Sequence, residues 1–345
     1  MRCLLVRQRL ATTIPLALGL NLAFAATAQA HVKWFCAFDV AGQPRSLQNV
    51  LCQDFEFLFG LTVLSLMAGC LVEGTQLGAA MLRSIDRATA FLQENTELLF
   101  RAGCGFFFVA IWAAGGILLT PELKTTSPVV GMIQLGVAAG MLSRRTMPLS
   151  AIGIALLFMI GVWQYGAFHL ADYPVFLGVA AYLVLTGLQR DFWGARPIDV
   201  VRWTASVTLM WASVEKWAYP EWSFPLFIEH PTLSMGLDPE FFMRAAGAVE
   251  FALAFALVWT PLVRRIAAVI LTAMFTSAVF EFGKIDMIGH TLIVVVLVAI
   301  IADQCKESAW NSYRWLVPVT YTAALVAFLG VYYAAHSLFY GSPII

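Results

Sequence analysis

The chain has 345 residues, of which 60% are hydrophobic and only 12% are charged, and its formal net charge is zero. Soluble domains carry about 25% charged residues, so this composition excludes an ordinary soluble protein and indicates a surface that largely faces lipid. The 21 basic residues are matched by 21 acidic ones, which excludes the positive surface that nucleic-acid binding requires. We expect an all-α, polytopic transmembrane helix bundle whose main partner is the lipid bilayer.

The first 30 residues have the pattern of a secretory signal peptide. Three arginines precede an apolar run over residues 11–26, and an A-x-A cleavage pattern ends at Ala30. Since a transmembrane helix takes about 20 residues, the run is short for a span, and an uncleaved first helix is the alternative. Cleavage after Ala30 makes His31 the amino terminus of the mature protein.

Residues 31–53 then form a short exported segment. Its first residue, His31, offers an α-amine and an imidazole nitrogen, which together suit Cu(II). Cys36 and Cys52 lie in the same segment. An oxidising compartment allows these two cysteines to form a disulfide, and two free thiols are the alternative.

Ten apolar segments follow, most of them near the length of a membrane span. They cover residues 54–72, 98–119, 128–142, 149–168, 173–188, 198–218, 241–260, 262–282, 287–302 and 315–335. Arginine pairs such as Arg144-Arg145 and Arg264-Arg265 fall in loops that an exported amino terminus places in the cytoplasm, as the positive-inside rule requires. We therefore expect a bacterial inner-membrane protein with a periplasmic mature amino terminus.

Four spans in each half of the chain share features that indicate a tandem duplication. In each unit an arginine opens the first span, a Pro-Glu pair follows it, an arginine pair precedes the third span, and an aspartate precedes the fourth. These residues are Arg101 and Arg202, Pro121-Glu122 and Pro220-Glu221, Arg144-Arg145 and Arg264-Arg265, and Asp172 and Asp286. Two repeats of four spans would have the same orientation, although periodic hydrophobicity alone imitates part of the match.

The expected organisation has six regions. They are a signal peptide (1–30), the exported segment (31–53), a first span with a charged cytoplasmic connector (54–97), a first four-helix unit (98–188), a second four-helix unit (198–303), and a last span with an exported tail (313–345). The connector has the apolar spacing of a helix that lies at the membrane interface.

Short motifs in the second unit match those of a known membrane family. In chain order they are Arg202, Glu215-Lys216-Trp217, Pro220, the run Gly247-Ala248-Val249-Glu250, Arg264-Arg265 and Glu281-Phe282-Gly283. With these motifs residues 198–303, and more faintly 98–188, resemble the DoxX-like family of four-helix membrane proteins. That family is linked to membrane redox systems, including a thiosulfate:quinone oxidoreductase subunit, so the resemblance implies a quinone or respiratory context.

The predicted topology places all five histidines at or near the exported side. They are His31, His169, His230, His290 and His336. Imidazole groups and a terminal amine suit copper, and nearby methionines at 235, 243 and 287 suit Cu(I). We therefore predict an exported-side metal site formed by His31 and His290 with His230 or His336. The alternative is that the histidines are interfacial residues with ordinary hydrogen bonds.

Three carboxylates are predicted to lie beneath this site. Glu250 falls near the middle of its span, with Glu215 and Glu281 nearer the exported ends of theirs. An ionised group at the centre of a membrane helix costs about 2.5–3.5 kcal/mol, so such residues face the bundle interior and often mark function. The structural alternative pairs Glu250 with Arg202 or Lys216.

Residues 217–225 are rich in aromatic residues and proline. Such a segment suits a cap on the exported surface, or alternatively a lid over a quinone or metal site. The sequence contains no P-loop, dinucleotide fingerprint, G-x-S-x-G or H-E-x-x-H motif.

Three functions follow from these patterns. The first is a periplasmic-side protein that binds or passes a metal, copper above all, working with a membrane or periplasmic redox or metal-carrier protein. The second is a quinone-linked redox subunit in which Glu250 and His290 serve proton transfer. The third is a non-catalytic scaffold. Clustering of His31 with His290 favours the first, an apolar cleft that ends at Glu250 favours the second, and full pairing of buried charges without a cavity favours the third; whether the chain is an enzyme stays open.

Overall fold

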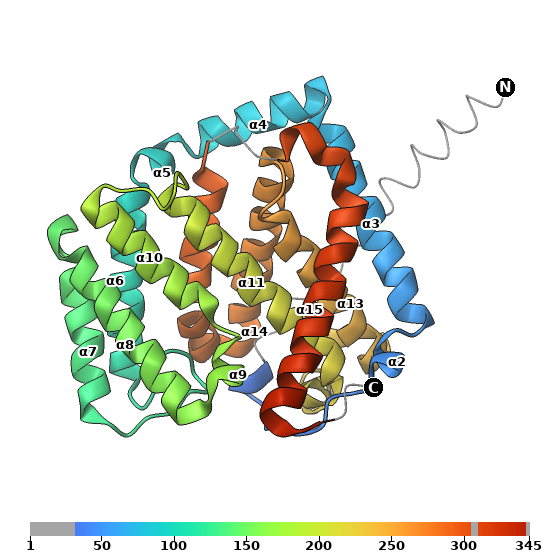
Figure 1. Cartoon of the computed structure of the whole chain (residues 1–345), viewed down its shortest axis with the longest axis horizontal. Helices are drawn as coiled ribbons and strands as arrows, with labels where there is room; N and C mark the ends of the chain where they lie inside the picture. Colours follow the sequence, from blue (N-terminus) through green and yellow to red (C-terminus); the bar gives the residue numbers. More distant parts are fainter. Residues whose placement is uncertain (1–31, 305–309, 343–345) are drawn as a thin grey trace.

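Long helices make up most of the chain (Figure 1). The computed structural model describes residues 32–304 and 310–342, and in that part the only β-structure is two isolated bridges. The long helices are α3 (Gln53–Glu73), α6 (Thr96–Ala114), α7 (Pro128–Gly140), α8 (Met147–Tyr165), α10 (Pro174–Leu188), α11 (Pro197–Ala218), α13 (Pro239–Ala256), α14 (Pro261–Ala302) and α15 (Val317–Tyr340). The expected all-α class is confirmed.

Shorter elements connect these helices. They are η1 (Val32–Trp34), α2 (Leu47–Val50), α4 (Gln76–Ala88), α5 (Ala90–Glu94), η2 (Arg144–Thr146), α9 (Ala167–Leu170), η3 (Pro220–Ser223), α12 (Phe224–Glu229), η4 (Pro231–Ser234) and η5 (Asn311–Leu316). Helices α4 and α5 lie across one end of the bundle, and α9 lies at the opposite end (Figure 1). We call these the α4 end and the α9 end.

Five helical segments in the described chain are long and apolar enough to cross a membrane. They are Gln53–Glu73, Thr96–Ala114, Arg144–Tyr165, Pro261–Ala302 and Asn311–Tyr340, and two shorter apolar helices are Pro128–Gly140 and Pro174–Leu188. These helices are those of a membrane protein. Each of the ten predicted segments overlaps a helix or one part of α14, while a count of ten crossings stays a prediction.

One boundary differs clearly from the expectation. The second apolar segment was expected to continue to residue 119, but α6 ends at Ala114. Gly115 and Gly116 have φ angles of 72° and 67°, and successive left-handed residues cannot continue a right-handed helix. The following chain turns back, and Ile117 forms an isolated bridge with Lys124.

Helix α14 is a hairpin of two arms rather than one straight rod. Gly283, with φ 70° and ψ −146°, interrupts its helical backbone, a conformation that only glycine adopts at low cost. Arg265 in the first arm donates from Nε to the carbonyl oxygen of Ile301 in the second arm at 2.7 Å. The rings of Phe275 and His290 stack at 4.7 Å between the arms. The two arms match the two segments predicted at 262–282 and 287–302.

The segment predicted to be exported, whose described residues are 32–53 and which keeps the name exported segment below, packs onto the bundle at the α9 end. The backbone N–H of Arg45 donates to the carbonyl oxygen of Ala218 at 3.0 Å. The hydroxyl of Tyr333 donates to the carbonyl oxygen of Arg45 at 2.6 Å, and that of Tyr219 to the carbonyl oxygen of Gly42 at 2.7 Å. These bonds fix the segment across the ends of α11 and α15, so its side chains can reach the bundle interior.

Candidate functional site

Lys33 of η1 lies inside the bundle between two carboxylates. Its ammonium contacts Asp172, which follows α9, and donates to Glu215 of α11 at 2.8 Å. The side chain of Lys33 is only 1% exposed and that of Asp172 is fully buried. Phe38 and Trp222 place their rings 5.8 and 5.7 Å from the ammonium. A charge this deeply buried is stable only with such partners.

The protonation of this cluster follows from its charges. Burial by itself lowers the pKa of Lys33, but the carboxylates of Asp172 and Glu215 raise it more, so the net shift is upward and the ammonium stays charged. Burial raises the pKa of Asp172, although the Lys33 ammonium opposes that rise. Both carboxyl groups contact the same ammonium, and a second buried negative charge there would stay uncompensated, so we expect one of the two to carry a proton. One ammonium beside one carboxylate and one carboxylic acid is electrically neutral.

Lys216 and Glu250 form a second ion pair, between α11 and α13. The Glu250 side chain is 8% exposed. The two helices approach closely because Gly247 leaves room for Trp217: a Cβ at Gly247 would lie 2.4 Å from the indole nitrogen. Of the two partners that the sequence allowed for Glu250, the structure selects Lys216.

His290 lies on the second arm of α14 with its Nδ1 facing a carboxylate. That nitrogen is 3.0 Å from Oδ2 of Asp286, one helical turn earlier. The rings of Trp34 and Phe275 each lie 4.7 Å from the imidazole. Gly289 makes the Trp34 contact possible, because a Cβ there would lie 2.2 Å from the indole ring. A carboxylate at Nδ1 fixes the ring and leaves Nε2 for a ligand or a proton.

These groups meet at a pocket in the bundle, which we call the central pocket. Its free volume is about 70 Å³. Its polar lining is Thr120, Asp172, Tyr173, Thr208, Lys216, Glu250 and His290, and its apolar lining is Trp34, Val175, Phe176, Leu209, Ala212, Phe275, Gly289, Leu292 and Ile293. The walls are therefore mostly apolar, with acids, an ammonium and an imidazole among them.

A second, smaller cavity lies beside the central pocket at the α9 end, and we call it the outer cavity. Its free volume is about 30 Å³, and it is lined by Lys33, Ala212, Glu215, Lys216, Tyr219, Trp222, Ser223 and Met243. Ala212 and Lys216 line both spaces. One face of α11 therefore separates the two cavities, and the aromatic insert that the sequence predicted as a cap or lid covers the outer one.

Glu122 stands behind the wall of the central pocket. Its Oε1 accepts from the Thr120 hydroxyl at 2.9 Å and from the Tyr173 hydroxyl. Burial raises the pKa of Glu122 above its usual value. In the sequence analysis, Glu122, Asp172 and Asp286 served only as evidence for the tandem duplication. Lys33 was not predicted to belong to a site. Lys33 and Asp172 are 139 residues apart, so no local signal indicated their contact. The pair of Asp286 and His290 did have one, because residues four apart share a helix face.

The predicted metal ligands are not brought together within the described chain. His230 lies 2.6 Å from Glu281. The Glu281 side chain is 40% exposed, so the prediction that it is buried beneath a site was wrong. His336 is buried, with Nε2 at 2.9 Å from both the Tyr219 hydroxyl and the Val40 carbonyl oxygen. His31 lies outside the described residues. No three His, Cys, Asp or Glu side chains in residues 32–304 and 310–342 form a group that could hold a metal ion.

The four described histidines nevertheless lie at the α9 end, as the predicted topology requires. Phe38 contacts His169 at a ring distance of 5.5 Å, Trp34 contacts His290, and Val40 accepts from His336. Each of these contacts comes from the exported segment. The imidazole of His169 is neutral, because burial and the nearby Lys33 ammonium lower its pKa to about 3.

Cys36 and Cys52 are free thiols, so the disulfide predicted between them is not formed in this structure. The two residues have different surroundings. The Cys36 thiol hydrogen-bonds to the backbone at Leu226 of the insert, and burial raises its pKa. Cys52 instead precedes α3 as its N-terminal cap.

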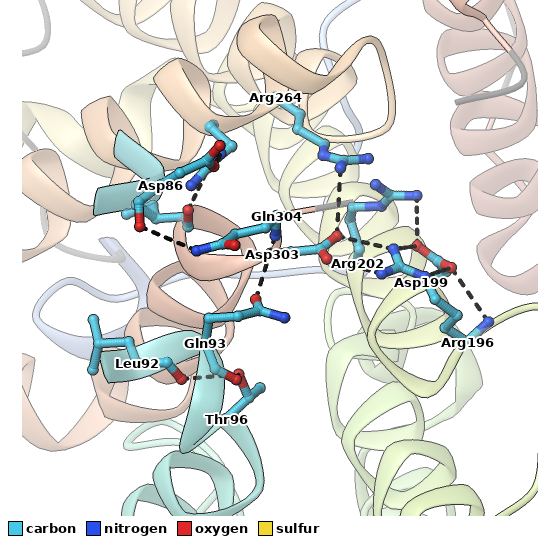
Figure 2. A network of polar contacts seen from close by, with 12 residues as sticks. Asp86, Leu92, Gln93, Thr96, Arg196, Asp199, Arg202, Arg264, Asp303 and Gln304 are labelled. Carbon is cyan, nitrogen blue, oxygen red and sulfur yellow. Dashed lines mark hydrogen bonds and ion pairs between the residues drawn. The ribbon is translucent and has the colours of Figure 1, made fainter. Parts of the chain in front are cut away.

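A second charged network lies at the α4 end (Figure 2). Asp303, after the second arm of α14, pairs with Arg196 at 2.8 Å and with Arg264 of the first arm at 3.4 Å. Asp199 pairs with Arg196 at 2.8 Å and with Arg202 at 3.0 Å. The chain of alternating charges joins the two ends of α14 to the start of α11.

No family model, characterised protein or solved structure matches this chain. The resemblance of residues 198–303 to the DoxX-like family stays a prediction.

Proposed function

We propose that this membrane protein binds a quinone-type ligand in the central pocket and exchanges protons with it. The observation that carries the proposal is a mostly apolar pocket whose lining includes Glu250, His290 and Lys216. Its free volume of about 70 Å³ is smaller than that of most small-molecule sites, about 300–1,000 Å³, so a quinone head group has to widen the pocket as it enters. The same pocket speaks against a scaffold whose buried charges are paired without leaving space.

The lining suits the chemistry of a quinone head group. Each of its two carbonyl oxygens accepts hydrogen bonds, which the Lys216 ammonium and a protonated His290 can donate. Two-electron reduction of a quinone takes up two protons, and Glu250 and the His290–Asp286 pair are groups that hold and release protons. The electrons would come from a membrane or periplasmic redox protein.

Binding of a short-chain quinone to the purified full chain tests this proposal. Trp34 lines the pocket, so quenching of its fluorescence reports binding, and a Trp34→Phe variant identifies that signal. The Glu250 carboxylate holds the Lys216 ammonium in place, so Glu250→Gln should disturb the hydrogen bond that Lys216 donates to the quinone. A hydrogen bond from a charged group contributes about 1.5–3 kcal/mol. We expect quinone affinity to fall about tenfold or more.

Glu240→Gln is the matched control, because Glu240 lies on the same helix but pairs with Arg45 and Arg244 outside the pocket. Its affinity should equal that of the wild type. Equal affinity in all three proteins, or no saturable quinone binding, rejects the proposal.

Copper handling is the second candidate, and one contact favours it. Trp34, at the start of the described exported segment, lies against His290, whose Nδ1 faces Asp286 as in many metal-bound histidines. The test determines the amino terminus by mass spectrometry and compares copper stoichiometry with a His31→Ala variant. A terminus at His31 with near-stoichiometric copper that the variant loses supports a metal site; equal trace copper in both proteins rejects it.

We further propose a cleaved signal peptide, ten spans and two four-helix units in a bacterial inner membrane. Matching contacts support the duplication: Arg144 donates to the carbonyl oxygen of Thr186 near the end of α10, and Arg265 to that of Ile301 near the end of α14. In both units an arginine before or within the third helix thus binds the end of the fourth. Labelling of single cysteines from either side of the membrane tests this topology.

A further inference from the structure

The cluster of Lys33, Asp172 and Glu215 lies where the two cavities meet. Asp172 lines the central pocket, and Glu215 lines the outer cavity. The Lys33 ammonium contacts both carboxyl groups, which brings Asp172 and Glu215 together around one cation. Each end of this short polar connection therefore faces a different space.

The charge balance requires a proton in this connection. Two carboxylates and one ammonium would leave a net negative charge among side chains that are at most 7% exposed, and an uncompensated buried charge is costly. Other titratable groups around the pair come from several elements: Lys216 on α11, Tyr173 with Glu122 behind it, His169 on α9, Tyr219 before η3, and Tyr332 on α15. Lys216 is the only other cation among these groups, and it is already paired with Glu250.

We propose that Asp172 and Glu215 hold one proton in common beside Lys33 and form the proton connection between the outer cavity and the central pocket. The proposal deepens the quinone function, because it names the route by which that ligand would exchange protons. A proton enters on Glu215 from the outer cavity while the held proton leaves from Asp172 into the central pocket. The cluster has the same net charge before and after each transfer, so no buried charge accumulates.

Infrared spectroscopy of the ligand-free full chain tests for the shared proton. A protonated carboxyl group has a carbonyl band that shifts in D₂O. We expect Asp172→Asn and Glu215→Gln each to remove one carboxyl band, because the remaining carboxylate then pairs with Lys33. Glu240→Gln, which removes a carboxylate outside both cavities, should leave the band unchanged. If either cluster variant keeps every carboxyl band of the wild type, the proposal is overturned.

The route is tested by the rate at which that band exchanges hydrogen for deuterium. Ser223→Leu fills part of the outer cavity, and we expect it to slow the exchange at least tenfold. Leu209→Trp fills the central pocket and should leave the exchange rate within about twofold of the wild type. An exchange rate in Ser223→Leu equal to that of the wild type, or equal slowing in both variants, overturns the proposed connection. The amplitude of the carboxyl band shows that each variant has folded with the cluster intact.

Quinone binding keeps this test separate from that of the proposed function. Leu209→Trp should abolish quinone binding while the carboxyl band remains. A protein with the band and the expected exchange rates but without quinone binding would retain the proton connection and lose the quinone assignment. Quinone binding without the carboxyl band would support the quinone assignment and reject the proton connection.

Discussion

Ion-pair networks lie at both ends of the bundle, but they differ in their ratio of cations to carboxylates. At the α9 end, one lysine meets two carboxylates beside two cavities. At the α4 end, three arginines alternate with two aspartates and tie helix ends together (Figure 2). The first arrangement has an excess of groups that can take up a proton, whereas arginine keeps its proton under all ordinary conditions. This difference supports the proposed proton exchange at the α9 end, whereas the α4 network joins helix ends through permanent charges.

The largest expected effect is at the α4 end. Asp303→Asn removes the carboxylate that pairs with both Arg196 and Arg264, and the Arg264 side chain is fully buried. Loss of one partner of a buried ion pair costs about 3–5 kcal/mol. We expect a loss of that size in the free energy of unfolding, measured in mixed detergent micelles. Asp54→Asn is the control, because Asp54 is 51% exposed and an exposed ion pair contributes about 0–1 kcal/mol. Equal losses of unfolding free energy in the two variants would contradict a structural role of the Asp303 network.

Lys33→Met should make stability depend on pH at the α9 end. Burial raises the pKa of Asp172, and Lys33 opposes that rise, so the variant has a still higher folded-state pKa. A folded pKa above the unfolded value of about 3.9 means that stability is complete at acid pH and falls as pH rises through the folded pKa. We therefore expect the melting temperature of Lys33→Met, relative to the wild type, to fall between pH 5 and pH 8. A constant difference between the two proteins across this range would show that Lys33 does not control the carboxyl pair.

A smaller effect of opposite sign is expected for Glu122→Gln. Burial raises the pKa of Glu122, so its ionisation opposes folding as pH rises through the folded-state value. Glutamine keeps the shape without the charge, and we expect a gain of about 1 kcal/mol at pH 8 and little change at pH 5. The measurement is again the melting temperature at both pH values, and a loss of stability at pH 8 would contradict the expectation.

The smallest effect is expected at the surface of the α9 end. Arg45 pairs with Glu221 and Glu240 through a side chain that is 25% exposed. Exposed pairs contribute about 0–1 kcal/mol, so Arg45→Gln should change stability by less than about 1 kcal/mol and leave quinone affinity unaltered. A larger loss would show that the exported segment depends on this side chain rather than on its backbone bonds to Ala218 and Tyr333.

Much of the helical organisation follows from the sequence alone. Apolar runs locate the helices because hydropathy is a local property, and the two segments at 262–282 and 287–302 predict the two arms that Gly283 separates in α14. The same reasoning places Glu250 inside the bundle, since lipid cannot solvate a carboxylate. Positive-φ glycines such as Gly115 end a helix earlier than the hydropathy predicts.

The composition of the site was decided only by the tertiary structure. Glu250 could pair with Arg202 or Lys216, and packing of α11 against α13 selects Lys216. Lys33 meets Asp172 and Glu215 across 139 and 182 residues of chain, so no local pattern indicates their contact. His230, His290 and His336 share one end of the bundle yet have separate partners. A sequence determines which residues must leave lipid, whereas helix packing determines which of them meet, because ion pairs and cavities depend on distances that only the folded chain sets.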